Sequence, residues 1–197
     1  MSKQVEFIFD VGSPTSYLAY RELPKIASET GATIVWTPVL LGGLLQAIGN
    51  AAPTEIPAKR AWFFADVGRW AKKYAVTFQP NPHFPINTLA LQRGAIALQG
   101  TPHFKAYMEA VFGAMWQTPR NLGDVGTIEQ VLREADIDPV DFKARIASPE
   151  VKARLKENTD AAIAKGAFGC PTFFVGEEMF FGQDRLSFVR EALAAQL

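Results

Sequence analysis

The segment from Phe9 to Leu18 constrains the fold of this 197-residue chain more than any other part of its sequence. It leads from the apolar end of a predicted strand, through a glycine, into a helix that opens with Ser13 and Pro14. Serine is a favoured N-cap, and proline suits the first helical position because its missing N–H has no helical partner there. A helix N-terminus presents free N–H donors and a partial positive charge. We therefore predict an anion-binding site at this turn.

Composition argues against several classes of function. The chain has 20 basic and 20 acidic residues, and its cations are scattered, so we expect no nucleic-acid partner. No apolar run approaches the ~20 residues of a membrane span, so we expect no membrane partner either. A single cysteine precludes an internal disulfide. The only histidines, His83 and His103, lie in separate segments, and we expect no metal site.

The beginning of the sequence bears on its compartment. Met1–Gln4 leads directly into the first predicted strand, so we expect no signal peptide. With one cysteine and no disulfide, the chain is typical of a reducing compartment, and we expect a cytoplasmic location.

Strand patterns occur only near the two ends of the chain. Val5–Phe9 and Thr33–Val39 are β-prone runs on either side of a helix predicted over Pro14–Thr30, which Gly31 ends. A strand–helix–strand unit of this length predicts a parallel pair with a right-handed crossover.

The C-terminal part predicts a second unit of sheet and helix. Thr172–Val175 and Glu178–Phe181 flank a two-residue turn and predict a hairpin. Asp184 follows and is expected to cap a last helix.

The long middle of the chain shows helical patterns and no convincing strand. Thr127 with Gln130 predicts a capping box, and Ser148 before Pro149 predicts another helix start. Helices are expected over these ranges: Pro57–Tyr74, Asn87–Gln99, Pro102–Trp116, Thr127–Ala135, Pro139–Ala147 and Pro149–Lys165. The Pro-rich stretch Phe78–Pro85 predicts a rigid loop near the cleft between the two parts. This span is too long for an ordinary crossover, so we predict an all-helical subdomain, 44–165, inserted into a split β-α-β…β-β-α domain of 1–43 and 166–197.

Three motifs carry a family resemblance. They are Gly12-Ser13-Pro14 before Ser16-Tyr17-Leu18, Phe168–Thr172 before the third strand, and Phe181–Leu186 at the last helix. In this order and spacing the chain resembles kappa-class glutathione transferases and, more closely, 2-hydroxychromene-2-carboxylate isomerases. The stretch Val111–Trp116 favours the isomerases. The resemblance implies an α/β, thioredoxin-like fold, in which the position of Ser13–Ser16 usually holds Cys-x-x-Cys.

With that resemblance, Ser13 is implied to hold and activate the sulfur of glutathione. A free cysteine thiol has a pKa of about 8.5, and lowering it by about two units needs roughly 2.7 kcal/mol of preference for the anion. A helix terminus supplies about 0.3–1 kcal/mol where exposed. A hydrogen bond to a charged group supplies about 1.5–3 kcal/mol. The alternative from the residues alone is that Ser13 only caps the helix; Ser16, inside the first turn, is less suited to the catalytic role.

The other implied contacts with glutathione come from three segments. A cis bond at Pro171 would turn the backbone of Cys170 toward the cysteinyl part of glutathione, while the Cys170 side chain packs in the interior. A mixed disulfide of Cys170 with glutathione is the alternative. The γ-glutamyl end is assigned to Gln183, Asp184 and Arg185, and the glycyl end to Asn50 and Lys59. Each charged residue among them also fits an ordinary surface position.

The implied function is a glutathione-dependent isomerase of aromatic hydrocarbon catabolism, of the type found in naphthalene degradation. Its reaction would convert 2-hydroxychromene-2-carboxylate to trans-o-hydroxybenzylidenepyruvate, and the family suggests a homodimer. A flat aromatic substrate would lie against some of the many aromatic residues of the insertion: Trp62, Phe63, Phe64, Trp70, Phe84, Phe112 and Trp116. Two alternatives are a kappa-like transferase that consumes glutathione, and a non-catalytic thioredoxin-like module that binds an extended peptide beside Pro171.

Overall fold

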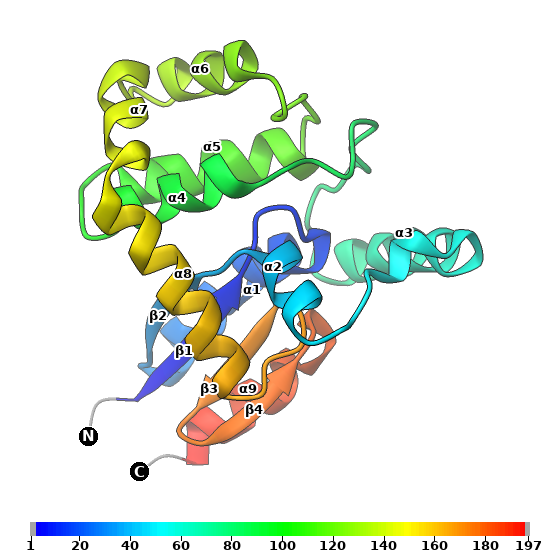
Figure 1. Ribbon diagram of the computed structural model, residues 1–197. Helices are drawn as coiled ribbons and strands as arrows, with labels where there is room; N and C mark the ends of the chain where they lie inside the picture. Colours follow the sequence, from blue (N-terminus) through cyan, green and yellow to red (C-terminus); the bar gives the residue numbers. More distant parts are fainter. Residues whose placement is uncertain (1–2, 196–197) are drawn as a thin grey trace.

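The computed structural model describes residues 3–195 (Figure 1). The secondary-structure elements follow in this order: β1 (Gln4–Phe9), α1 (Pro14–Thr30), β2 (Thr33–Pro38), α2 (Leu41–Ala47), η1 (Pro53–Glu55), α3 (Pro57–Lys73), α4 (Leu89–Leu98), α5 (Phe104–Trp116), α6 (Val125–Glu134), α7 (Pro139–Ala147), α8 (Pro149–Ala164), β3 (Thr172–Val175), β4 (Glu178–Phe181), η2 (Gln183–Arg185) and α9 (Leu186–Ala195).

The four strands form one mixed sheet in the order β2-β1-β3-β4. β1 runs parallel to β2, with Phe7 opposite Trp36, and antiparallel to β3, with Phe7 also opposite Phe173. β3 and β4 form the expected antiparallel hairpin. The predicted α/β, thioredoxin-like arrangement of β-α-β and β-β-α units is confirmed.

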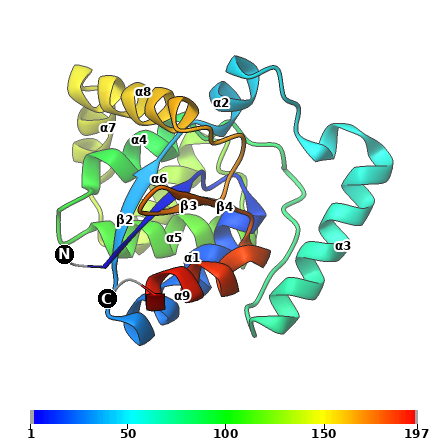
Figure 2. The same ribbon diagram turned by 90° about the horizontal axis from the view of Figure 1, so that it is seen from below.

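Successive residues of β1 point to opposite faces of the sheet, and both faces are covered. Val5, Phe7 and Phe9 belong to the main core, to which α1 and α9 contribute Leu18 and Val189. Ile8 points to the other face and packs in a smaller cluster with residues of α2 and α8: Leu44, Ala162 and neighbours. Figure 2, seen from below, shows α1 and α9 on one side of the sheet and α8 on the other.

The middle of the chain is helical, as predicted, and within residues 44–165 the structure contains no strand. Helices α4 to α7 lie together above the sheet, whereas α3 stands apart from them (Figures 1 and 2). Only Val67 and Ala71 of α3 are buried. The domain boundaries at 43/44 and 165/166 stay a prediction; α2 runs across the first of them.

Two local predictions are wrong, and one helix was not predicted. Helix α6 begins two residues earlier than expected, because Asp124 caps it and accepts hydrogen bonds from the Thr127 N–H at 2.8 Å and the Thr127 hydroxyl at 2.9 Å. Asp184 does not cap α9, since it lies inside the 3-10 turn η2 and pairs with Arg185. Helix α2 was not expected, because Gly42 and Gly43 lower its intrinsic helix propensity.

Other local predictions are confirmed. Ser148 caps α8, with Pro149 in its first turn. Residues 78–85 form a loop without regular structure.

None of the helices within residues 3–195 is long and apolar enough to cross a membrane.

Candidate active site

The hydroxyl of Ser13 lies where the N-terminus of α1 meets the loop before β3. Ser13 is 4% exposed, and its Oγ accepts a hydrogen bond from the Ser16 N–H at 3.1 Å, which confirms the predicted cap. The same hydroxyl donates to the carbonyl oxygen of Cys170 at 3.0 Å. Two segments 157 residues apart in sequence are therefore joined at this one atom.

Thr15 is a second donor to the Cys170 carbonyl, so the Ser13 hydroxyl can rotate away from that carbonyl without leaving it unpaired. Its Oγ1 lies 3.2 Å from the Cys170 carbonyl oxygen, to which it donates, and 2.9 Å from Ser13 Oγ. If the Ser13 hydroxyl rotates to donate to an anion, the Cys170 carbonyl keeps a donor in Thr15. The arrangement can therefore offer a hydrogen bond to an anion without leaving a buried carbonyl unpaired.

Asp10 anchors the turn that precedes Ser13. Its carboxylate is 1% exposed and accepts three hydrogen bonds, from the Gly12 N–H at 2.8 Å, the Leu41 N–H at 2.9 Å and the Thr88 hydroxyl at 3.0 Å. These donors come from the turn, α2 and the start of α4. Burial raises the pKa of Asp10, although all three hydrogen bonds oppose that change.

Gly12 is required by the closeness of this turn to α4. A Cβ atom at position 12 would lie 2.8 Å from Thr88 Cγ2, closer than side-chain carbons approach one another. The glycine therefore lets the β1–α1 turn pack on Thr88, whose hydroxyl bonds to Asp10.

The loop before β3 has the cis bond predicted at Cys170–Pro171. The Cys170 side chain is buried in the smaller core cluster with Ile8 and Leu44. Burial, with a smaller effect from the charge of Asp10, raises the pKa of this thiol well above its usual range. A thiol held neutral is a poor nucleophile, so the geometry favours packing over a mixed disulfide.

The loop after β4 lies against the same proline. The Gly182 N–H donates to the Pro171 carbonyl at 3.0 Å, which places η2, with Gln183, Asp184 and Arg185, beside the Cys170–Pro171 bond. Tyr74 reaches η2 from the end of α3, and its hydroxyl donates to the Gln183 carbonyl at 2.6 Å. Asp184 and Arg185 form an exposed ion pair with one another at 2.8 Å.

Asn50 and Lys59 are placed differently with respect to this loop. The Asn50 side-chain amide donates to the Phe168 carbonyl at 3.3 Å, so Asn50 joins the segment that carries Cys170. Lys59 is exposed in the first turn of α3. No hydrogen bond or ion pair within residues 3–195 brings Lys59 to the other predicted site residues. The roles of all these residues toward glutathione stay predictions.

Aromatic side chains of the insertion continue from the Ser13 turn. The Trp116 Nε1–H donates to the Val11 carbonyl at 2.8 Å. Phe84 packs on the ring of Trp116 with centroids 5.7 Å apart, and Phe64 packs on Phe84 at 5.8 Å. Trp62, in contrast, is 63% exposed and contributes nothing to the core. Phe112, another member of the predicted set, packs on Phe9 before the turn and on Tyr17 after it.

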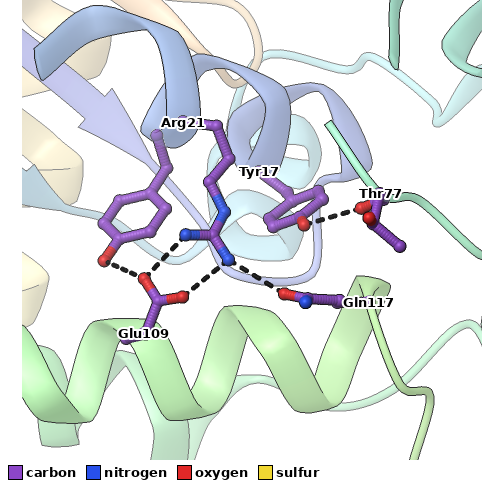
Figure 3. Close-up of polar contacts among 6 residues, drawn as sticks. Tyr17, Arg21, Thr77, Glu109 and Gln117 are labelled. Atoms are coloured by element: carbon purple, nitrogen blue, oxygen red, sulfur yellow. Dashed lines mark hydrogen bonds and ion pairs between the residues drawn. The ribbon is translucent and has the colours of Figure 1, made fainter. Parts of the chain in front are cut away.

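Polar side chains fix α1 against α5 (Figure 3). Glu109 of α5 accepts hydrogen bonds from Arg21 at 2.8 Å and from Tyr20 at 3.1 Å. Arg21 also donates to Gln117 at 2.9 Å, and Tyr17 donates to the Thr77 carbonyl at 2.7 Å. The helix that carries Ser13 is thereby held to the insertion along its first two turns.

Sequence reasoning missed Asp10, Thr15 and Thr88. A carboxylate directly after a buried strand, two residues before a glycine, is the one local signal for Asp10. Nothing in the sequence near Thr88 indicates its partner, which is 78 residues away. As for metals, residues 3–195 contain no cluster of three or more His, Cys, Asp or Glu side chains suited to hold one.

Fold and site together define the class of protein. The chain belongs to the family of DsbA-like thioredoxin domains, whose profile matches residues 4–194. Its sequence has a single cysteine, Cys170, so it cannot hold the cysteine pair of a disulfide oxidoreductase, and α1 begins with Ser13 and Ser16. A DsbA oxidoreductase from Streptomyces coelicolor shares the fold at 18% identity, with a TM-score of 0.72 over 97% of this chain and 88% of its own.

More similar relatives are named as isomerases. The chain is 34% identical to a 2-hydroxychromene-2-carboxylate isomerase from Pseudomonas sp. (strain C18), over 96% of this chain and 89% of the relative. A solved structure of 2-hydroxychromene-2-carboxylate isomerase matches with a TM-score of 0.86 and 30% identity, covering 96% of this chain and 94% of that one. Glutathione S-transferase kappa 2 from Caenorhabditis elegans is 28% identical over 98% of this chain and 92% of its own length. These full-length relatives support an enzyme of the isomerase type.

Proposed function

We propose that this chain is a glutathione-dependent isomerase that interconverts 2-hydroxychromene-2-carboxylate and trans-o-hydroxybenzylidenepyruvate. The observation that carries the proposal is the Ser13 hydroxyl, which lies buried at the N-terminus of α1 and 3.0 Å from the Cys170 carbonyl oxygen. Full-length relatives named as 2-hydroxychromene-2-carboxylate isomerases support the choice of reaction.

The residues around Ser13 fit glutathione by their chemistry. Asp184 offers an acceptor and Arg185 a donor for the ammonium and carboxylate of the γ-glutamyl end. The Cys170 backbone would pair with the cysteinyl part, and Asn50, with Lys59, would hold the glycyl carboxylate. When bound, glutathione supplies a thiolate that adds reversibly to the conjugated, ring-opened substrate and leaves again after rotation about the former double bond.

The chain's own contribution is to favour a thiolate at one place. Ser13 turns its hydroxyl from the Cys170 carbonyl toward the sulfur, while Thr15 keeps that carbonyl paired. The first turn of α1 adds the positive end of its dipole. Asp10 holds the Gly12 turn, and therefore the position of Ser13, without touching the sulfur.

A kappa-like transferase is the second candidate, and the 28% identity to glutathione S-transferase kappa 2 favours it. The two functions share the Ser13 site and differ in the fate of glutathione. An isomerase regenerates glutathione in each cycle, whereas a transferase consumes one equivalent per electrophile.

The deciding experiment follows the absorbance of 2-hydroxychromene-2-carboxylate with the purified enzyme, with and without glutathione. We expect conversion that requires glutathione in less than stoichiometric amount, with free thiol unchanged at the end. Conversion that consumes thiol would identify a transferase. No conversion by a folded protein that binds glutathione would exclude this substrate.

A further inference from the structure

A cavity lies outside the Ser13 site, between α2, α4 and α8. It has a volume of about 370 Å³ and is walled by the apolar side chains of Leu40, Leu89, Leu155 and Ile163. Gly43 and Ala47 of α2 line one side of it. Ser13, Cys170 and Pro171 do not line it, so it is separate from the site proposed for glutathione.

The charges around this cavity are unbalanced. Three cations line it, Arg93, Lys152 and Lys156, against the single carboxylate of Asp160. Asp160 forms an ion pair with Lys156, one turn earlier on α8. Two cationic groups of the lining, Arg93 on α4 and Lys152 on α8, therefore have no carboxylate paired with them within residues 3–195.

Arg93 is the more informative of the two. Its Nε atom is buried and has no hydrogen-bond partner in the part of the chain that the structure describes. None of the ion pairs found within residues 3–195 includes Arg93. A buried guanidinium donor without an acceptor is unfavourable, and a carboxylate is the acceptor whose geometry it matches.

An apolar wall with cations among its lining residues favours a ligand of a particular chemistry. A small monocarboxylate with an aromatic or aliphatic body would bury its carbon atoms against Leu89 and Leu155 and present its charge to Arg93. A neutral molecule of the same shape would leave the Arg93 Nε–H unpaired.

We propose that the cavity between α2, α4 and α8 binds a small organic monocarboxylate through Arg93, with Lys152 as a second, exposed cation. Its location gives it a structural connection to the Ser13 turn. Leu40 and Leu89 line the cavity, and their neighbours Leu41 and Thr88 donate hydrogen bonds to Asp10. The proposal does not use Ser13 and does not depend on the isomerase reaction.

Titration calorimetry with 4-phenylbutyrate as the probe tests this site, and 4-phenylbutanamide serves as the uncharged match. We expect one phenylbutyrate to bind per chain whether or not glutathione is present, and the amide to bind roughly tenfold or more weakly. Arg93→Gln should weaken binding of the acid by a similar factor. Ala47→Trp, which fills the cavity from α2 and leaves every charge in place, should abolish it.

Two matched variants serve as controls. Arg190→Gln removes an arginine of α9 that pairs with Glu29, and Ala161→Trp places a large side chain on the exposed face of α8. Both should bind the acid like the wild type. The proposal is wrong if the wild type binds no acid, if acid and amide bind equally, if glutathione displaces the acid, or if Ala47→Trp binds it normally. Loss of folding in Arg93→Gln would leave Ala47→Trp and the amide as the deciding tests.

Discussion

The Ser13 hydroxyl caps α1 and is proposed to hold the glutathione thiolate, and one substitution measures the size of each contribution. Ser13→Ala removes the N-cap of α1, which costs about 1 kcal/mol of stability. It also removes the hydrogen bond proposed for the thiolate, worth about 1.5–3 kcal/mol, so kcat/KM should fall by roughly 10- to 150-fold. Denaturant unfolding would measure the loss of stability, and steady-state kinetics with the ultraviolet absorbance of the bound thiolate would measure the loss of activation.

Ser148 provides a matched control for the cap alone. It is also a serine N-cap followed by proline. Its Oγ accepts a hydrogen bond at 3.3 Å from the N–H of the residue three positions later, Val151, just as Ser13 Oγ accepts one at 3.1 Å from the Ser16 N–H. Ser148→Ala should lose similar stability and keep full activity. An active Ser13→Ala variant would favour the non-catalytic module, which predicts indifference to this change.

Asp10 gives a prediction with a defined dependence on pH. Its pKa is raised above 3.8 by burial, so the folded state binds the proton more tightly than the unfolded state. Stability therefore falls as the pH rises from 3.8 through the raised pKa. Asp10→Asn abolishes this titration. The NH₂ group of the asparagine is itself a donor and would face the backbone or hydroxyl donors that bond to Asp10, so the free energy of unfolding should fall by about 1–3 kcal/mol.

The measurement is denaturant unfolding of the wild type and of Asp10→Asn at several pH values. The stability advantage of the wild type should shrink as the pH rises across that window and then stay constant. An advantage that grows with pH would mean that the three hydrogen bonds outweigh burial.

Local residue chemistry made Ser13 predictable and left Asp10 hidden. The strand, Ser13 and Pro14 follow one another in sequence, so together they predict a helix that begins at a serine N-cap. Asp10 acquires its role from Leu41 and Thr88, which are 31 and 78 residues away. Such partners follow only from the packing of α2 and α4 on the turn.

At the scale of elements, the β1–α1 turn is fitted to the start of α4. Gly12→Ala would place Cβ 2.8 Å from Thr88 Cγ2, and the crowding should cost about 1–3 kcal/mol. Thr88→Ser removes that methyl group and keeps the hydroxyl that bonds to Asp10. The double variant should regain most of the lost stability and activity.

Gly68 is the control for this pair, because a Cβ there meets nothing within 4 Å on α3. Gly68→Ala should be neutral or stabilising, as expected for a glycine inside a helix. If Thr88→Ser fails to rescue Gly12→Ala, the glycine is needed for another reason than its contact with α4.

Elements with strong local signals were placed accurately from sequence. The first helix was predicted over its observed range, Pro14–Thr30, because Ser13 begins it and Gly31, at φ 70°, ends it. α2 was missed, since its two glycines oppose a helix that packing of Leu44 against Ile8 stabilises. α6 was predicted to begin at Thr127 but begins at Val125, because Asp124 and not Thr127 is its N-cap.

At the scale of the whole molecule, the candidate site is assembled from four distant parts of the chain. The β1–α1 turn, the Asn50 region and the start of η2 each donate a hydrogen bond to the loop before β3. Ser13 donates to the Cys170 carbonyl, Asn50 to the Phe168 carbonyl and Gly182 to the Pro171 carbonyl. A ligand that contacts all four parts binds only the folded state and must stabilise it.

Glutathione should therefore raise the melting temperature of the wild type. At about 100 times its Kd, a ligand adds about 2.7 kcal/mol. This corresponds to roughly 5–10 °C for a domain of this size.

S-methylglutathione keeps both ends of the molecule and has no thiol to ionise. Its stabilisation should be insensitive to pH, whereas that of glutathione should increase as the pH rises toward the pKa of the thiol. In Ser13→Ala the two ligands should become similar, because the difference between them lies in the thiolate. An equal pH response of both ligands in the wild type would contradict a site built to hold that anion.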